Sequence, residues 1–414
     1  MKDGNTKQKE ASRVCWGELE SWVRGQVQGL IQNLLEEEVT ELIGRQRHER
    51  RCGVDAPEAY RNGHAKPRRL TLSSGTVTVR RPRVRNLEER FESRILPLFV
   101  RRTRAVADLL PELYLHGLSL GDFDLALRGL LGEKAPLSAS TVSRLKEKWQ
   151  GEYGVWSCRR LDELEVVFLW VDGVYVKAGL EKDKAALLVA VAGLSDGRKV
   201  LVAMNAGHRE SEDSWSALLR DLRERGMNAP RLVLGDGNLG IWAGLRNVFP
   251  EAEEQRCWNH RIVNILTKIP KRSQPQARMM LRAIPYADTA EEATRLKGVF
   301  QKWCRARGLH PAAELIDRDW ERMVTFYRFP KDHWRHLRTS NAIESPFAFL
   351  RLRTDAAKRF KKVENATAVI YKMFLVAERR FRKLNSPELL KEVFLGVTFH
   401  NGMPVKRQQT EAAA

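Results

Sequence analysis

The amino-terminal part of the chain carries hydrophobic residues at helical spacing. Between residues 17 and 44 they follow one another in steps of three and four: Val23, Val27, Leu30, Ile31, Leu34, Leu35, Val39, Leu42 and Ile43. This spacing is typical of an amphipathic helix. We expect its apolar stripe to pack into a core or to form a dimer seam rather than to bind a ligand.

The next segment changes to the alternation of a β-hairpin. Polar residues separate Leu70 from Leu72 and Val77 from Val79, and a Ser-Ser-Gly turn lies between the two pairs. The run RRPRVR at 80–85 then predicts an extended basic arm, because a proline cannot continue a helix.

Residues 105–150 look helical and contain a candidate helix-turn-helix. Residues 118–132 would form the first helix, 133–137 the turn, and 138–150 the second helix, which a serine can cap. A recognition helix of this kind enters the major groove. Its polar face would offer Ser143, Arg144, Lys146 and Lys148. A helical hairpin without this function has the same pattern, so both interpretations stay open.

After Trp156 the pattern becomes that of an α/β domain with a mixed sheet. Three apolar runs come first: LEVVFLWVDGVYVKAG, KAALLVAVAG and RKVLVAMNAG. An amphipathic helix, a buried strand (RLVLGDGNLG), another helix and a possible fifth strand (AEEQRCWNH) follow. Three consecutive strands and then alternating helices and strands predict this class. Residues 262–335 read as an all-helical insertion, and the tail beyond about Phe399 is expected to be disordered.

The charge of the chain predicts a polyanionic partner. The 72 Lys+Arg and 52 Asp+Glu give a net charge of +20. Residues 45–104 hold 17 Lys+Arg against 6 Asp+Glu, a local net of +11. A solvated basic surface is one explanation, but this density favours contacts with phosphates.

The remaining bulk features predict a cytoplasmic protein. No apolar run approaches the roughly 20 residues of a membrane span, and the first residues lack the apolar region of a secretory signal. The five cysteines are scattered, odd in number and without a CxxC pair, which fits a reducing compartment. We expect no membrane association.

Two aspartates lie at strand positions. Asp172, in LWVDGVYV, belongs either to an Asp-Gly hairpin turn or to the middle of one continuous strand from Val166 to Val176. In the second case its buried charge requires a partner such as a divalent cation. Asp236, in LVLGDGNLG, is either a turn residue or a ligand at the carboxyl end of a strand, where α/β sheets bind their ligands.

A third acid, Glu344, lies in a basic segment, HLRTSNAIESPFAFLRLRT. Asn341 could cap a helix and Glu344 close a capping box. Pro346 suits the first helical position, which would make Ser345 the cap and leave Glu344 before the helix. With two strand acids, Glu344 would complete a set of oxygen ligands for two Mg²⁺ ions, which drive phosphodiester chemistry when about 3.5–4 Å apart.

Four motifs in order, VDGVYVKAG, LVLGDGNLG, EEQRCWNHRIVNIL and TSNAIES, resemble the Mutator-type DDE transposases of bacterial insertion sequences. The resemblance covers about residues 20–395. It implies an RNase H-like fold with a helical insertion between the second and third acids. It also assigns Asp172, Asp236 and Glu344 as the catalytic and metal-binding triad. Pro346 departs from the family, which usually has a polar residue there.

The pattern and the resemblance together divide the chain into six segments. They are an N-terminal helix and basic hairpin for DNA binding or oligomerisation (1–104), a helix-turn-helix domain (105–155), the first part of the catalytic core (156–261), the helical insertion (262–335), the second part of the core (336–398) and the tail (399–414). Basic residues on these segments are expected to contact DNA: Arg80, Arg81, Arg83, Arg85, Arg144, Lys146, Lys148, Arg351, Arg353, Lys358, Arg359, Lys361 and Lys362.

Cys257 and His260 match the CxxH motif of the same family. With His333 and His336 they could also form a zinc site, but the spacing is too loose for a zinc finger. We expect a polar contact that organises the site or DNA, and we do not expect zinc. Mg²⁺ is the expected cofactor, and Mn²⁺ could substitute for it.

These features together predict a transposase that binds the terminal inverted repeats of an insertion sequence. It would cleave one DNA strand and join the freed 3′-hydroxyl to target DNA. Synapsis of two ends predicts a homodimer or a larger assembly, associated with the bacterial nucleoid. Two alternatives stay open: an RNase H-like nuclease without joining activity, and a catalytically silent DNA-binding regulator.

Overall fold

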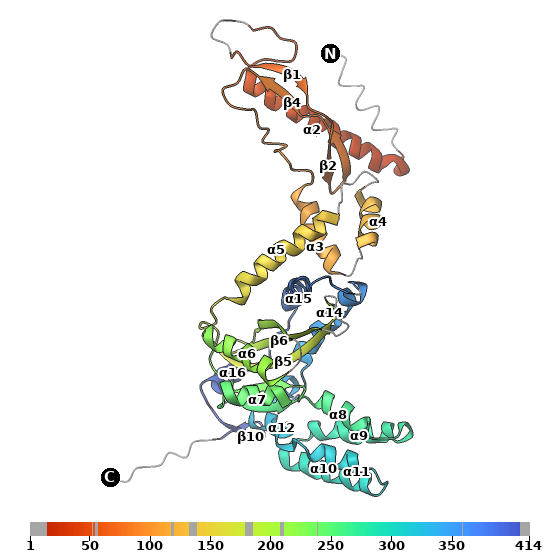
Figure 1. Ribbon diagram of the computed structural model, residues 1–414, viewed down its shortest axis with the longest axis vertical. Coiled ribbons are helices and arrows are strands. Elements are labelled where there is room, and N and C mark those ends of the chain that lie inside the picture. Colours follow the sequence, from red (N-terminus) through yellow and green to blue (C-terminus); the bar gives the residue numbers. More distant parts are fainter. Residues whose placement is uncertain are drawn as a thin grey trace, which may run out of the picture. The chain divides into compact units, whose positions relative to one another are not determined.

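The computed structural model describes residues 15–51, 53, 57–116, 120–131, 139–178, 185–207, 211–237, 239–357 and 359–405. The chain divides into two compact units, Met1–Leu145 and Lys146–Ala414 (Figure 1). Each unit has its own hydrophobic core, so we describe them in turn.

The N-terminal unit is built on one long helix, α2 (Leu19–Ile43), which a short 3₁₀ turn (Trp16–Glu18) precedes. The helix predicted from the apolar steps is therefore confirmed. Gly44 ends it in the left-handed conformation, with φ of 70°. Buried Leu35 packs with Leu70, Val77 and Val79 of the hairpin, so the apolar stripe contributes to a core.

The predicted hairpin is confirmed, but the basic arm is not free. Strands β2 (Arg68–Leu72) and β3 (Gly75–Val79) pair antiparallel. The RRPRVR segment is extended as expected, yet its second part forms β4 (Pro82–Arg85) and pairs with β1 (Tyr60–His64). The predicted extended conformation is therefore confirmed, and the partner strand β1 satisfies backbone hydrogen bonds of β4.

Three helices cover the stretch predicted to be helical. They are α3 (Arg104–Leu115), α4 (Leu120–Leu131) and α5 (Ala139–Ser157). The predicted turn, 133–137, lies outside the described residues. The helix-turn-helix therefore stays a prediction.

The second unit contains a mixed sheet of five strands in the order β7-β6-β5-β8-β9. The first three strands pair antiparallel, while β8 and β9 run parallel to β5. The strands are β5 (Val166–Val176), β6 (Ala185–Leu194), β7 (Lys199–Gly207), β8 (Leu232–Gly235) and β9 (Glu253–Arg256). The predicted mixed α/β domain is confirmed. Asp172 pairs with Val189 inside β5, so the alternative of an Asp-Gly hairpin turn was wrong.

Helices cover both faces of this sheet (Figure 1). On one face α6 (Glu212–Glu224) and α7 (Leu239–Val248) form a core with Leu169 and Val171. Because side chains alternate along a strand, Phe168 and Trp170 face the opposite side. The helices α14 (Asn341–Ala357), α15 (Val363–Glu378) and α16 (Pro387–Phe394) pack against the sheet there.

Between β9 and α14 the chain is helical, as predicted. The helices are α8 (Trp258–Leu266), α9 (Gln274–Ala283), α10 (Ala290–Arg305), α11 (His310–Asp317), α12 (Trp320–Val324) and α13 (Trp334–Leu337), with 3₁₀ turns between several of them. Within the described ranges, no helix is both long and apolar enough to cross a membrane.

The start of the predicted disordered tail is ordered. Strands β10 (Phe399–His400) and β11 (Met403–Pro404) form a small antiparallel pair. The side chain of Asn401 accepts a hydrogen bond from the backbone of Ala290, and the backbone of Gly402 bonds to Tyr327. These contacts hold residues 399–405 on the helical insertion, whereas residues 406–414 lie outside the described part of the chain.

A half-buried acid, Asp319, ties the insertion to the sheet. Its carboxylate lies 2.5 Å from Arg256, 3.0 Å from Arg261 and 3.0 Å from Arg322. The side chain of Arg261 is only 2% exposed, and burial lowers its pKa to about 10. Asp319 adopts the left-handed conformation, with φ of 69°, which Asp and Asn tolerate best among non-glycine residues.

We predict that Asp319→Asn destabilises the protein by about 3 kcal/mol, since it leaves buried arginines without their counter-charge. Asparagine keeps the shape and the backbone conformation, so the change isolates the charge. Urea denaturation measures the effect. Asp288→Asn, which removes an exposed partner of Lys331, is the matched control and should leave the midpoint unchanged. Equal midpoints for the two variants would refute the role of Asp319.

Candidate active site

The two predicted aspartates lie on neighbouring parallel strands. Phe168 aligns with Leu232, and Trp170 aligns with Leu234. Continuing this register by two residues brings Asp172 beside Asp236, on strands about 4.8 Å apart. Gly235 supports the alignment, because a Cβ placed there would lie 3.5 Å from Val171. Both acids therefore reach the same edge of the sheet.

Asp172 faces the side of the sheet that α14 covers. It shares its strand face with Phe168 and Trp170, and only 9% of its surface is exposed. Its Oδ1 accepts the backbone N–H of Gly173 at 2.8 Å.

Glu344 lies in the first turn of α14, the helix that packs against β5. The hydroxyl of Ser340 donates to its Oε1 at 2.5 Å, and the backbone N–H of Glu344 bonds to the Ser340 carbonyl at 3.0 Å. Asn341 and Pro346 both lie inside the helix. Both predicted caps were therefore wrong: Asn341 does not precede the helix, and Ser345 does not begin it.

Cys257 connects the segment of Asp236 to that of Glu344. Its backbone N–H donates to the carbonyl of Gly235 at 2.9 Å, directly before Asp236. Its buried Sγ accepts the backbone N–H of Ser340 at 3.3 Å and lies 3.7 Å from Oε1 of Glu344. One residue of the CxxH motif thus fixes the positions of two of the three acids.

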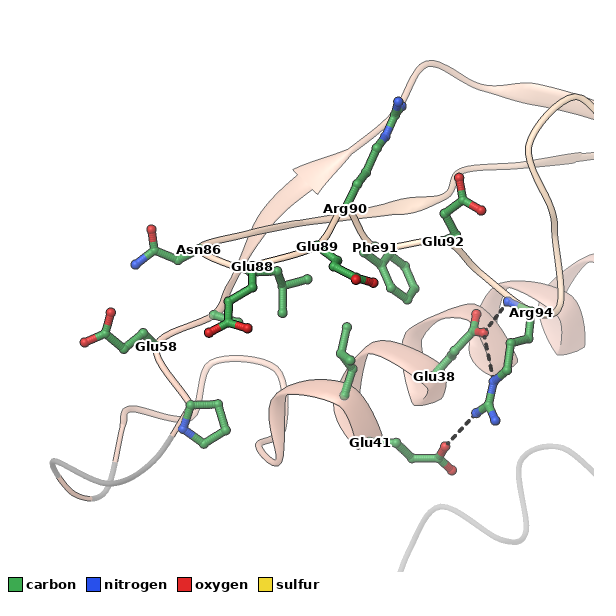
Figure 2. A pocket seen from close by; sticks show the side chains of 14 residues that line it. Glu38, Glu41, Glu58, Asn86, Glu88, Glu89, Arg90, Phe91, Glu92 and Arg94 are labelled. Atoms are coloured by element: carbon green, nitrogen blue, oxygen red, sulfur yellow. Dashed lines mark hydrogen bonds and ion pairs between the residues drawn. The ribbon is translucent and has the colours of Figure 1, made fainter.

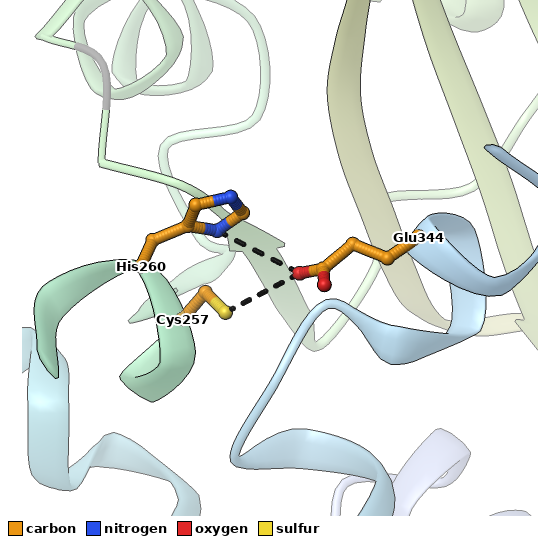
Figure 3. Close-up of side chains that lie close together, drawn as sticks. All are labelled: Cys257, His260 and Glu344. Carbon is orange, nitrogen blue, oxygen red and sulfur yellow. Dashed lines mark hydrogen bonds and ion pairs between the residues drawn. The ribbon is translucent and has the colours of Figure 1, made fainter. Parts of the chain in front are cut away.

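His260 lies on the same side of the first turn of α8 as Cys257 (Figure 3). Its Nδ1 is 3.6 Å from Oε1 of Glu344. The pKa of His260 is raised to about 9, first by the side chain of Cys257 and then by the charges of Glu344 and Asp172, against the opposing effect of burial. Two of the three acids therefore act on one imidazole.

This donor set fits a hard divalent cation. All three predicted ligands are carboxylates, the groups that Mg²⁺ prefers in proteins. Asp172 and Asp236 share one sheet edge, and α14 brings Glu344 to the same face.

The four-residue zinc set that the sequence suggested is not brought together. His333 Nε2 lies 3.2 Å from the carbonyl oxygen of Ser386, and His336 Nε2 lies 3.2 Å from the side chain of Asn385. Both histidines therefore contact the segment before α16, rather than Cys257 and His260. Burial lowers the pKa of His336 to about 4, which keeps it neutral.

The candidate DNA-contacting residues lie in several places. In the N-terminal unit Arg80, Arg83, Arg85 and Arg144 are exposed, and Arg81 is half-buried. In the second unit Lys146 is half-buried, and the exposed Lys148 lies 3.7 Å from Glu152. Near α14, the exposed residues are Arg351, Arg359, Lys361 and Lys362. The side chain of Arg353 and the whole of Lys358 lie outside the described residues.

Positive charges crowd together on the N-terminal unit. Burial lowers the pKa of Arg68, and the nearby charges of Arg101 and Arg81 lower it further. The pKa of Arg102 is lowered in the same way, by burial and then by Arg144. Arginines that repel one another on a folded surface are stabilised by a bound polyanion.

An acidic pocket lies elsewhere on the same unit (Figure 2). It has a volume of about 960 Å³, and its lining includes Glu38, Glu41, Glu58, Glu88, Glu89 and Glu92. Glu38 is held by Ser93 and by the backbone of Arg94. Carboxylates repel phosphates, so this pocket does not belong to the basic surface.

Sequence reasoning missed two residues that shape the site. Ser340 carries a weak signal, since a serine four residues before a glutamate can bond to it within one helical turn. Gly237 follows Asp236 with φ of 94°, and a Cβ there would lie 2.2 Å from Nε of Arg256. The glycine is visible in the sequence, but its contact with Arg256 is not, because that contact depends on the tertiary fold.

Comparisons with known proteins place the chain among the transposases. The family described as "Transposase, Mutator family" matches residues 4–383. The transposase for insertion sequence element IS6120 of Mycolicibacterium smegmatis is 42% identical over 73% of this chain and 93% of its own length. The transposase for IST2 of Acidithiobacillus ferrooxidans is 37% identical over 67% and 95%, and that for ISRM5 of Rhizobium meliloti (strain 1021) is 27% identical over 88% and 89%.

This chain belongs to the Mutator family of transposases. The resemblance seen in the four sequence motifs is therefore confirmed. The family match covers both compact units, so the basic N-terminal unit is part of the family's common architecture.

We predict that Gly237→Ala lowers both stability and activity. The left-handed backbone costs an alanine about 1–3 kcal/mol, and its Cβ would displace Arg256 and disturb the turn that follows Asp236. Thermal unfolding and DNA cleavage measure the two effects. Gly298→Ala is the matched control, because nothing lies near its Cβ within α10, and it should stabilise by about 0.5–1 kcal/mol. A fully stable, active Gly237→Ala variant would contradict the role of this turn.

Proposed function

We propose that this transposase acts on the ends of an insertion sequence, and that Asp172, Asp236 and Glu344 are its catalytic carboxylates. The observation that carries the proposal is the β5–β8 register, which brings the two aspartates side by side when it is continued by two residues. The packing of α14 on β5 supports the third assignment, because it directs Glu344 to the same face.

The core of the proposed enzyme is RNase H-like. The order β7-β6-β5-β8-β9 supports this assignment, with three antiparallel strands followed by two parallel ones and helices on both faces. In such a sheet the long central strand β5 supplies the first acid, and the shorter parallel strand β8 supplies the second. The helical insertion separates them along the chain from the third acid.

The three carboxylates would hold two Mg²⁺ ions, and Mn²⁺ could replace them. Bound magnesium polarises a phosphoryl oxygen and makes a coordinated water more acidic. The chain's own residues pre-organise this set. Ser340 and Cys257 orient Glu344, and the β5–β8 register fixes the two aspartates.

The proposed reaction consists of two in-line displacements at phosphorus. In the first, water forms a P–O bond and the P–O3′ bond at the element end breaks, which leaves a 3′-hydroxyl and a 5′-phosphate. In the second, that 3′-oxygen attacks a phosphodiester of the target and displaces the target's 3′-oxygen. Neither displacement needs a covalent bond between protein and DNA.

The crowded arginines of the N-terminal unit support a role in binding duplex DNA. Exposed Arg83 and Arg85 lie on one face of β4, since they alternate with the more buried Pro82 and Val84. We propose that they contact phosphates of the terminal repeats, and that the basic residues near α14 hold DNA beside the carboxylates. Synapsis of two ends would require at least two copies of the chain, in the cytoplasm at the nucleoid.

We predict that Asp172→Asn, Asp236→Asn and Glu344→Gln each lower Mg²⁺-dependent cleavage and joining by at least about 1,000-fold, equivalent to about 4 kcal/mol of transition-state stabilisation. DNA binding should persist, because these changes remove no positive charge. Purified protein and a duplex carrying the flanking inverted repeats provide the assay.

Asp213→Asn is the matched control, because this exposed acid lies on α6, at the opposite face of the sheet. Its activity should equal that of the unmodified protein. Cleavage without joining in the unmodified protein would instead indicate a nuclease. No Mg²⁺-dependent cleavage at all would indicate a silent DNA-binding regulator.

We predict that the double change Arg83→Gln and Arg85→Gln weakens DNA binding and reduces the slope of log K against log salt by about 2, since each lost phosphate contact contributes about 0.9. Binding is measured between low and moderate salt. Arg295→Gln serves as the control, because Arg295 is already paired with Glu292 at 2.7 Å. An unchanged slope in the double variant would exclude β4 from the DNA interface.

A further inference from the structure

Cys257, His260 and Glu344 form a cluster of a second chemical kind. They offer a thiol sulfur, an imidazole nitrogen and a carboxylate oxygen, which all lie within 4.8 Å of one another (Figure 3). Cys257 caps α8 and His260 lies in its first turn, so both project from one side of the helix. Glu344 reaches them from α14.

Two of the three atom pairs have the spacing of a tetrahedral zinc site. Zinc bonds of about 2.0–2.3 Å at tetrahedral angles place neighbouring ligand atoms about 3.4–3.6 Å apart. Here Sγ of Cys257 lies 3.7 Å from Oε1 of Glu344, and Nδ1 of His260 lies 3.6 Å from the same oxygen. The remaining pair, Sγ of Cys257 and a ring nitrogen of His260, lies within 4.8 Å, so small side-chain adjustments would allow all three atoms to bind one ion.

The surroundings also suit a thiolate ligand. The sulfur of Cys257 lies at a helix N-terminus and accepts the backbone N–H of Ser340 at 3.3 Å, two contacts that suit a metal-bound sulfur. Nδ1 of His260 is buried and lies 3.6 Å from Oε1 of Glu344, so a metal ion could bind there in place of its proton. The hydroxyl of Ser340 orients the carboxylate.

We propose that Cys257, His260 and Glu344 form a Zn²⁺ site whose fourth position is open to water. The mixed S, N and O donors favour zinc over Mg²⁺, which prefers oxygen alone. This site revises the expectation of no zinc: that expectation considered His333 and His336 as the other ligands, whereas the fold supplies Glu344 in their place.

Zinc bound there would inhibit the transposase. Glu344 cannot serve the zinc site and the proposed magnesium set with the same oxygen, so each metal weakens binding of the other. This consequence rests on the proposed function, whereas zinc binding itself does not. Zinc would then act as a negative regulator through the third catalytic carboxylate.

Metal binding is tested on the reduced, metal-free full-length protein, without DNA. Co²⁺ serves as a spectroscopic substitute for zinc, and competition with a chromophoric chelator gives the zinc affinity. We expect one equivalent of Co²⁺ to produce sulfur-to-cobalt charge-transfer absorption. Cys257→Ser should abolish this band and weaken zinc binding by at least about 100-fold, since loss of outer-shell partners alone costs about 10–100-fold.

Two further variants keep the test decisive if Cys257→Ser fails to fold. His260→Asn and Glu344→Gln alter partly exposed residues, and each should weaken zinc binding by at least about tenfold. Cys158→Ser, at an exposed cysteine, is the matched control and should bind zinc like the unmodified protein. Equal zinc affinity in the control and in both variants would overturn the proposed site.

An activity assay with excess Mg²⁺ tests the regulatory consequence. Zinc should inhibit cleavage by the unmodified protein, and His260→Asn should raise the inhibitory zinc concentration at least about tenfold. Zinc that binds at this cluster without inhibiting would overturn the sharing of Glu344. If the protein cleaves no DNA even without zinc, the proposed function fails, and the cobalt spectra still decide whether the site exists.

Discussion

The parallel register between β5 and β8 is the constraint on which the site depends. It pairs Trp170 with Leu234, and Asp172 and Asp236 follow two residues later on the two strands, so the backbone rather than a flexible side chain would set the spacing of the two charges. The third acid arrives from a helix far along the chain. Cys257 stabilises that arrangement, because it bonds to the end of β8 through its backbone and contacts Ser340 and Glu344 through its sulfur.

Opposite electrostatic demands explain why the acids are placed as they are. A chain with a net charge of +20 attracts DNA, but three carboxylates close together repel both DNA and one another. Asp172 is buried in the sheet, and divalent cations would reverse the local charge of the three acids. The acids also act on a neighbouring histidine. The pKa of His260 is raised to about 9, first by Cys257 and then by the charges of Glu344 and Asp172.

The local pattern of hydrophobic and polar residues was enough to predict most helices and strands. It failed for segments whose structure depends on contacts with residues distant in the sequence. The strands and helices of the α/β core follow hydrophobic periodicity, and the three acids follow motifs within them. The strand β1 was missed because Tyr60–His64 has almost no apolar alternation. The predicted start of α14 was wrong because Pro346 is tolerated inside the helix. Residues 399–405 were predicted to be disordered because the residues that they contact, 290, 327 and 331, are distant in the sequence.

The position of Glu344 would link the two proposed metal sites through one side chain. Its oxygen lies close to the sulfur and nitrogen donors of α8, while its helix packs on the strand of Asp172. A rotamer change, rather than movement of a helix, would suffice to move the carboxylate between the two donor sets. Because this movement would involve so little of the fold, the relative concentrations of zinc and magnesium would decide which metal Glu344 binds. The contacts of Glu344 with Ser340 and Cys257 would determine how readily its carboxylate moves.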